Sequence, residues 1–507
     1  MRRKSLLLLA LVSFSLALLL AAVFNLIAIP SFNLPFEFAK PEPSQTEVDV
    51  ASTHLSVTAT DIPTTVKDAA QYGYGLRRTM NLLHGSTPEQ PNTVRVLFYG
   101  QSITRQSWWL EIEDYLRQRF PNANLLTANR AIGGFDSTKL VRTAEHDLYS
   151  FYPDLMIFHV YGNEEDYESI IANARRRTTT EILLISDHVT WLPGTANDLP
   201  SRLEEYEWHN QHSEHWLPQL AKQYGCELIE IRRPWEQYLR ANALPASTML
   251  IDNVHLNDRG NALMATLVRN HLQQMPIWAE QPDMVQTHAV GTDVQWNQGK
   301  LVLEFEGNRI DLLATTTETM PETRSDTSLS VAKVLIDGKT PSEFPELYAI
   351  TRPSDALGVD QPAVLQISAA NSLIPERWTA VITEINDTCD RFKFKVYGSE
   401  TGFDGEGQND RQFVSQSGRV VIDPEDWWLD DVYENLQIAT PAGFQVQWQV
   451  EPLFTNVYMP PIGQNFAQQQ TVTVAQNLPA TEHTLELIAP NGEVPITAIR
   501  TYRPPLP

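Results

Sequence analysis

The sequence predicts an α/β domain built on a parallel sheet, followed by an all-β region and preceded by a membrane-spanning segment. Short apolar runs alternate with amphipathic stretches in residues 93–276, as expected for a parallel sheet with helices on both faces. Alternating strand-like segments separated by turn signals fill residues 277–507. An uncharged, largely apolar run covers residues 5–29, and this is the predicted transmembrane helix.

The N-terminal segment is expected to target the chain to the membrane. Three basic residues, 2–4, precede the uncharged run, which is longer than the apolar core of an ordinary signal peptide. We therefore predict that residues 1–29 form an uncleaved signal anchor that contacts the membrane, with the rest of the chain exported. A cleaved signal peptide, which would give a secreted protein, is the alternative. Residues 30–92 are rich in Pro, Thr, Ser and Glu and are expected to form a stalk and linker.

The α/β domain, residues 93–276, is assembled from short apolar strands and amphipathic helices. The predicted strands are 94–99, 125–128, 155–161, 182–186 and 227–231. The predicted helices are 109–120, 138–151, 164–178, 201–224, 235–241 and 258–274. In such sheets a ligand binds beyond the carboxyl ends of the strands. Ser102 and Asn163 both follow a predicted strand closely, so we expect them at that edge.

The C-terminal region is expected to contain strands and no helices after about Pro276. Its alternating segments are separated by turn signals such as 337–338 and 491–492, which favours one or two β-sandwiches. The Gly-rich acidic stretch 402–407 is interpreted as a turn, with a calcium loop as the weaker alternative. The aromatic residues Trp427, Trp428 and Trp448 are expected to be buried, although exposed rings there would suit stacking on sugars.

Charge and cysteine usage argue against a nucleic-acid partner and against sites built from cysteines. The net charge of −24 and the lack of a basic stripe argue against a nucleic-acid partner. The two cysteines, Cys226 and Cys389, fall in different predicted regions, so neither a structural disulfide nor a thiolate zinc site is expected. His209, His212 and His215 recur at helical spacing; a solvated helix face is the preferred interpretation, and a metal site is the weaker one.

Two separated motifs supply the groups of a serine hydrolase. Ser102 lies in Gly-Gln-Ser-Ile-Thr at the end of the first predicted strand, and Asp252 precedes His255 by three residues. A serine hydroxyl is a poor nucleophile unless a base accepts its proton, and a carboxylate that fixes the imidazole completes the set. The sequence therefore predicts Ser102 as nucleophile, His255 as general base and Asp252 as its orienting carboxylate.

Together with two further motifs, these residues resemble the SGNH/GDSL hydrolase family over residues 93–276. The four blocks are 100–104 with Ser102, Asn-Arg-Ala-Ile-Gly-Gly at 129–134, Gly-Asn-Glu at 162–164, and Asp-Asn-Val-His at 252–255. The resemblance implies a flavodoxin-like three-layer α/β/α fold and the triad Ser102, His255 and Asp252. It also implies an oxyanion hole formed by Ser102, Gly134 and Asn163, although the neighbouring Gly133 leaves the choice of glycine open. Gln101 and Glu164 depart from the aspartates that the family has at those positions.

The resemblance implies an exported esterase that removes acyl groups, foremost acetyl, from a carbohydrate. The expected partner is an acylated glycan or a small acyl ester, and the mechanism requires no cofactor. The β-region more loosely resembles accessory domains of carbohydrate esterases, so its deletion is expected to affect targeting to glycans more than hydrolysis of a small ester. Two alternatives stay open: a polysaccharide O-acetyltransferase that uses the same residues, and a non-catalytic, anchored glycan-binding protein.

Overall fold

The computed structural model describes residues 73–194, 199–273, 284–315, 331–461, 469–490 and 492–507. These residues belong to one compact unit, Leu55–Pro507. The signal anchor at 1–29 and most of the stalk at 30–92 lie outside the described residues, and both stay predictions. Within the described stretches, none of the helices has the length and apolar character needed to span a bilayer.

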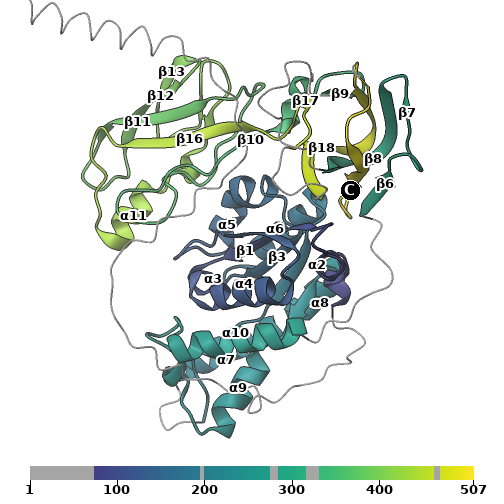
Figure 1. Ribbon diagram of the computed structural model, residues 1–507. Coiled ribbons are helices and arrows are strands. Elements are labelled where there is room, and N and C mark those ends of the chain that lie inside the picture. The colour runs from purple at the N-terminus through teal and green to yellow at the C-terminus, as the bar shows by residue number, and fades with distance from the viewer. Residues whose placement is uncertain (1–72, 195–198, 274–283, 316–330, 462–468, 491) are drawn as a thin grey trace, which may run out of the picture. The chain divides into compact units, whose positions relative to one another are not determined.

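The α/β domain contains a five-stranded sheet in which all strands are parallel, in the order β2-β1-β3-β4-β5. This is the strand order of flavodoxin-like folds, so the predicted sheet is confirmed (Figure 1). The strands are β1 (Thr93–Gly100), β2 (Asn124–Asn129), β3 (Leu155–His159), β4 (Glu181–Ile185) and β5 (Glu227–Ile229).

The central strands of this sheet are buried on both faces. In β1, Leu97 and Tyr99 belong to one hydrophobic core, and Val96 and Phe98 belong to another, because side chains alternate along a strand. The first core includes side chains of α5 (Ser137–Ala144), α6 (Glu164–Arg177) and α8 (Leu217–Tyr224). The second includes side chains of α2 (Arg77–His84), α4 (Trp108–Arg119), α9 (Arg232–Ala241) and α10 (Asp258–Gln273). The helices thus cover both faces, as a three-layer domain requires.

Two local features differ from the expected elements. The helix predicted over 201–224 is divided by a π-helical turn, His212–Trp216, into α7 (Pro200–Gln211) and α8. The segment before the first strand folds as a 3₁₀ turn, Tyr74–Leu76, and α2. The buried Arg78 of α2 pairs with Asp154 at 2.5 Å, which holds this helix against the amino end of the central strand β3.

The region after the α/β domain forms two large antiparallel sheets and a small one, in which β14 (Phe413–Val414) pairs with β15 (Val421–Ile422). The seven-stranded module consists of β6 (Val285–Ala289), β7 (Trp296–Asn297), β8 (Lys300–Thr315), β9 (Ala332–Ile336), β17 (Val457–Tyr458), β18 (Gln469–Ile488) and β19 (Ile496–Tyr502). The five-stranded module consists of β10 (Tyr348–Ile350), β11 (Arg377–Ile385), β12 (Phe392–Gly398), β13 (Gly402–Gln408) and β16 (Gln445–Pro452). Because β9 pairs with β17, the five-stranded module is an insertion between two strands of the other module.

Two expectations for this region are corrected. The chain returns to helix at α11 (Leu429–Leu436), whose Leu429 and Val432 are buried. The acidic stretch expected to be a turn is strand β13, paired with β12. Asp404 in that strand is buried and accepts hydrogen bonds from the backbone N–H and the hydroxyl of Ser417. Its carboxylate therefore binds a neighbouring segment of the same module. Trp427, Trp428 and Trp448 are buried as expected.

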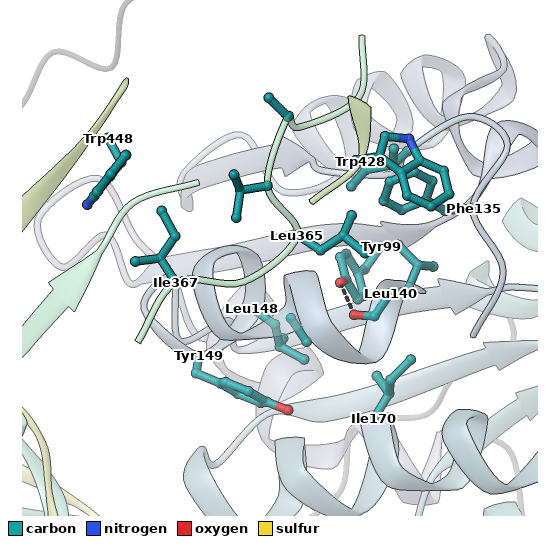
Figure 2. Close-up of a cluster of buried hydrophobic side chains, with 14 of the residues drawn as sticks. Tyr99, Phe135, Leu140, Leu148, Tyr149, Ile170, Leu365, Ile367, Trp428 and Trp448 are labelled. Atoms are coloured by element: carbon teal, nitrogen blue, oxygen red, sulfur yellow. Dashed lines mark hydrogen bonds between the residues drawn. The ribbon is translucent and has the colours of Figure 1, made fainter. Parts of the chain in front are cut away.

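The five-stranded module shares a continuous hydrophobic core with the α/β domain (Figure 2). Leu140, Leu148 and Ile170 from the helices of the α/β domain belong to the same buried cluster as Ile367 and Trp428 of the module. The seven-stranded module, by contrast, has a core of its own. Apolar burial contributes about 25 cal/mol per Å², so separating the five-stranded module from the α/β domain would expose a face that neither part covers alone.

Buried polar contacts fasten the same junction. Arg352 reaches from the module to the carboxylate of Asp147, which accepts from Nε at 2.8 Å and from a terminal guanidinium nitrogen at 2.6 Å. His146 donates from Nδ1 to the carbonyl oxygen of Ile350 at 2.8 Å and accepts at Nε2 from the N–H of Ile367 at 3.0 Å. Burial lowers the pKa of His146, which keeps the ring neutral and able to accept.

Candidate active site

Ser102 stands at the carboxyl edge of the parallel sheet, where β1 turns into the short helix Ser102–Arg105. Gly100 makes this turn with φ of +152°, and a Cβ there would collide with the carbonyl oxygen of His159 on the neighbouring strand, so only glycine fits. The hydroxyl of Ser102 donates to Nε2 of His255 at 2.9 Å. These two residues, 153 positions apart, are therefore in hydrogen-bond contact.

Asp252 fixes His255 through three contacts. One carboxylate oxygen accepts from the backbone N–H groups of His255 at 2.7 Å and Val254 at 2.8 Å. The other accepts from Nδ1 of His255 at 2.7 Å. The backbone N–H groups of His255 and Val254 lower the pKa of Asp252 to about 2, so this carboxylate is ionised at neutral pH. It holds the tautomer in which Nε2 is free to accept from Ser102.

The loop that carries His255 is tied to the segment that carries Ser102. The side-chain amide of Gln106 donates to the carbonyl oxygen of Leu256 at 2.7 Å and accepts from the Leu256 N–H at 3.0 Å. Gln101 offers Ser102 a competing acceptor at 3.4 Å, which is longer than the bond to His255. The geometry therefore favours transfer of the serine proton to the imidazole.

The glycine pair of the 129–134 loop lies beside Ser102. A Cβ on Gly133 would stand 4.0 Å from Cβ of Ser102, whereas a Cβ on Gly134 would stand 3.0 Å from Nε2 of Gln361. Gly134 has φ of +80°, a conformation that favours glycine. The peptide that joins the two glycines is thus close to both Ser102 and Gln361, and its N–H belongs to Gly134.

Asn163, predicted as the third oxyanion donor, is placed as the N-cap of α6. Its side-chain oxygen accepts from the N–H of Asp166 at 2.8 Å, and its Nδ2 donates to Asp166 at 2.6 Å and to Thr138 at 3.0 Å. Its two donations therefore go to Thr138 and Asp166 in this structure. The signal for the cap was present in the sequence, because acidic residues fill the first turn after Asn163. Its oxyanion role stays a prediction and requires one amide hydrogen to leave Asp166 or Thr138.

Replacing Asn163 with serine separates the two roles. Serine keeps an oxygen that caps the helix and removes the amide donor. We expect kcat for a small ester to stay within about tenfold of the wild type, because both amide hydrogens already have partners, whereas loss of an oxyanion donor typically costs on the order of 10²–10³ in turnover. Steady-state kinetics, with thermal unfolding as the control, distinguish the capping role from the oxyanion role. A hundredfold fall in kcat at an unchanged unfolding temperature would support the oxyanion role of Asn163.

A buried polar network that sequence analysis missed lies beneath the His255 loop. His188 donates from Nε2 to the carbonyl oxygen of Val254 at 2.9 Å and accepts at Nδ1 from Tyr161 at 3.3 Å. Burial lowers the pKa of His188 to about 3, so the ring is neutral and keeps this donor at neutral pH. Next to it, Asp187 accepts from His209 at 2.6 Å. No spacing pattern in the sequence connects these residues.

His188 is expected to position the triad loop through Val254. His188→Leu removes the donor and should lower kcat about tenfold or more, because small displacements of catalytic groups are costly, while KM changes little. His188→Gln retains an N–H donor of similar reach and should recover most of the lost kcat. Kinetics of both variants check this; equal losses in the two, together with equal falls in unfolding temperature, would reduce His188 to a packing residue.

Two of the three histidines at helical spacing, His209 and His212, contact other side chains of the protein. His209 contacts Asp187, and the buried His212 stacks between Trp208 and Trp216 at centroid distances of 5.1 and 4.8 Å. The expectation of a solvated face is therefore wrong for His212. Among the residues that the structure describes, no group of three or more potential metal ligands comes together.

A cavity of about 880 Å³ is lined in part by Asp252 of the triad and by the neighbouring Asn253. Its walls include Trp191 and Tyr206, whose rings meet edge to face at 6.2 Å, and the guanidinium of Arg232. Aromatic walls with a few fixed polar groups are typical of small-ligand sites. Neither Ser102 nor His255 lines this cavity, so it adjoins the triad through Asp252.

Comparisons with known proteins return esterases of known structure. No protein-family model matches the sequence, and neither does any curated protein. A two-domain esterase active on acetylated mannans aligns with 89% of this chain and 100% of its own, at 14% identity and a TM-score of 0.32. An acetylxylan esterase from Geobacillus stearothermophilus aligns with 37% of this chain and 98% of its own, at 14% identity and a TM-score of 0.31. A protein described as a GDSL-like lipase, from Parabacteroides merdae, aligns with 36% of this chain and 98% of its own, at 16% identity and a TM-score of 0.31.

Proposed function

We propose that this protein is a serine esterase that removes acyl groups, foremost acetyl, from a carbohydrate. The observation that carries the proposal is the continuous hydrogen-bonded line from Ser102 through His255 to Asp252, with distances of 2.9 and 2.7 Å. This is the arrangement that serine-hydrolase chemistry needs. The adjoining cavity with Trp191 and Tyr206 supports a sugar as the group that carries the ester.

The proposed reaction has two halves. The Ser102 oxygen bonds to the acyl carbon while His255 takes the serine proton, and the resulting oxyanion is held by the N–H groups of Ser102 and Gly134. The bond from the acyl carbon to the sugar oxygen then breaks, and His255 returns the proton to that oxygen. Water, deprotonated by His255, attacks the acyl-enzyme and releases the carboxylic acid and free Ser102. Asp252 stabilises the imidazolium in both halves.

Acetate release measures this function directly. The purified protein is incubated with acetylated mannan, acetylated xylan and a small acetyl ester, and free acetate is quantified; we expect acetate from the glycans. If acetyl groups instead appear on an added glycan acceptor, the protein is an O-acetyltransferase. Glycan binding without turnover of any ester would identify a non-catalytic binding protein and overturn the proposal.

We further propose that the esterase is exported and held at the membrane by residues 1–29. The basic residues 2–4 followed by the uncharged run 5–29 support this proposal. The N-terminal sequence of the protein from membrane and soluble fractions tests it. An intact N-terminus in the membrane fraction is expected, and a new N-terminus beyond residue 29 in the soluble fraction would show cleavage and secretion.

A further inference from the structure

The five-stranded module reaches the glycine loop of the candidate active site at two points. A guanidinium nitrogen of Arg352 donates to the carbonyl oxygen of Arg130 at 2.8 Å, and Nε2 of Gln361 donates to the carbonyl oxygen of Gly133 at 2.6 Å. Both acceptors belong to the loop 129–134. A segment more than 200 positions later in the chain thus contacts the loop that lies beside Ser102.

The amide of Gln361 has only one orientation that satisfies its neighbours. Its oxygen accepts from the indole N–H of Trp428 at 2.9 Å. Because an indole N–H only donates and a peptide carbonyl only accepts, the amide nitrogen must face Gly133. Trp428 is itself buried and packs edge to face on Phe135 at 5.0 Å (Figure 2). Gln361 is therefore a fixed donor rather than a mobile surface side chain.

The contact determines where the Gly134 N–H points. The Gly133 carbonyl and the Gly134 N–H belong to the same peptide, and in a trans peptide they point in opposite directions. Gln361 holds the carbonyl, so the N–H is directed away from the Gln361 amide. This loop lies beside Ser102, and the proposed function requires the same N–H to face an oxyanion on a Ser102 adduct. Donation to the carbonyl also polarises the peptide and strengthens its N–H as a donor.

We infer that Gln361 is a positioning residue of the oxyanion hole, so that the five-stranded module completes the active site. This inference rests on the proposed esterase function, and it runs against the expectation that deleting the β-region affects targeting to glycans more than hydrolysis of a small ester. Gln361 acts through the Gly133–Gly134 peptide and contacts no reacting atom. Its effect should therefore appear in the transition state, where the oxyanion exists, and not in substrate binding.

The test compares Gln361→Glu with the wild type on a small acetyl ester. Glutamate keeps the acceptor for Trp428 but turns an oxygen towards the Gly133 carbonyl. The Gly133 carbonyl therefore loses its hydrogen-bond donor. We expect kcat to fall about 10-fold to 100-fold, part of the usual cost of losing an oxyanion donor, with KM within about threefold. The affinity of an alkyl boronic acid, whose tetrahedral adduct with serine carries an oxygen in the oxyanion position, should fall by a similar factor.

Two further variants keep the result interpretable. Trp428→Phe retains the ring against Phe135 and removes only the N–H that orients Gln361; we expect a smaller fall in kcat, again with little change in KM. Gln449→Glu makes the same substitution at an exposed position of β16 in the same module and should leave kcat and boronate affinity unchanged.

The outcomes separate the inference from the proposed function. An active wild type with Gln361→Glu and Trp428→Phe both within twofold in kcat overturns the role of Gln361 and leaves the esterase function standing. A fall in kcat that comes with a fall in unfolding temperature, while the folded protein keeps its boronate affinity, also overturns the role of Gln361. A wild type that turns over no ester overturns both.

Discussion

Replacing Ser102 with alanine should abolish ester hydrolysis while the protein stays folded. The hydroxyl of Ser102 is the only group in the proposed line that can form the acyl bond, and its removal leaves only the oxyanion donors and substrate binding. Loss of a serine nucleophile from such a triad typically costs about 10⁴-fold or more in turnover. The measurement is kcat for a small acetyl ester, together with the thermal unfolding transition.

The chain offers a matched control for this substitution. Ser107 lies five positions later, is exposed, and makes no side-chain capping bond at the start of α4. Ser107→Ala should therefore leave kcat unchanged. If Ser102→Ala stays as active as Ser107→Ala, the nucleophile is another residue and the proposed mechanism fails, whatever the substrate.

The α/β domain could be predicted from sequence because its signals are local. All five parallel strands and the helices between them lie within a few residues of the expected ranges, since burial on both faces produces compact apolar runs and amphipathic helices keep their period. The residues of the triad were also predicted, because the spacing of Asp252 and His255 is short enough to be a motif. The structure brings these two and Ser102 into contact.

The features that could not be predicted from the sequence depend on contacts between distant segments. The five-stranded module interrupts the seven-stranded one, and a chain of similar alternating segments contains no marker for such an insertion. Helix α11 was missed because its eight residues are too few for a clear period. Gln361 and His188 belong to no motif, and each acts through a backbone carbonyl whose position only the fold determines.

Asn163 carries two signals at once. It matches a motif, which predicts an oxyanion role that stays a prediction, and it also has the local pattern of a helix start. An asparagine followed by Glu164, Glu165 and Asp166 is a typical helix start, because the side-chain oxygen caps the first turn and the carboxylates suit the positive end of the helix dipole. The structure gives the side chain this role.

The second large effect is expected at the junction between the five-stranded module and the α/β domain. Arg352→Met removes both hydrogen bonds to Asp147, whose side chain is 1% exposed. A buried carboxylate left without its partner costs about 3–5 kcal/mol. We therefore expect a lower urea midpoint and a lower unfolding temperature, measured by circular dichroism and tryptophan fluorescence.

A double substitution shows whether this loss comes from the stranded charge. Arg352→Met combined with Asp147→Leu fills the site with apolar groups, and such replacements of a buried ion pair are often neutral. The double variant should thus recover most of the stability, which gives a strong coupling in the mutant cycle. Because Arg352 also holds the carbonyl of Arg130, the recovered protein should still show reduced kcat, since the glycine loop has lost one of its two contacts with the module. Full recovery of stability and of kcat together would mean that this loop is positioned by the α/β domain alone.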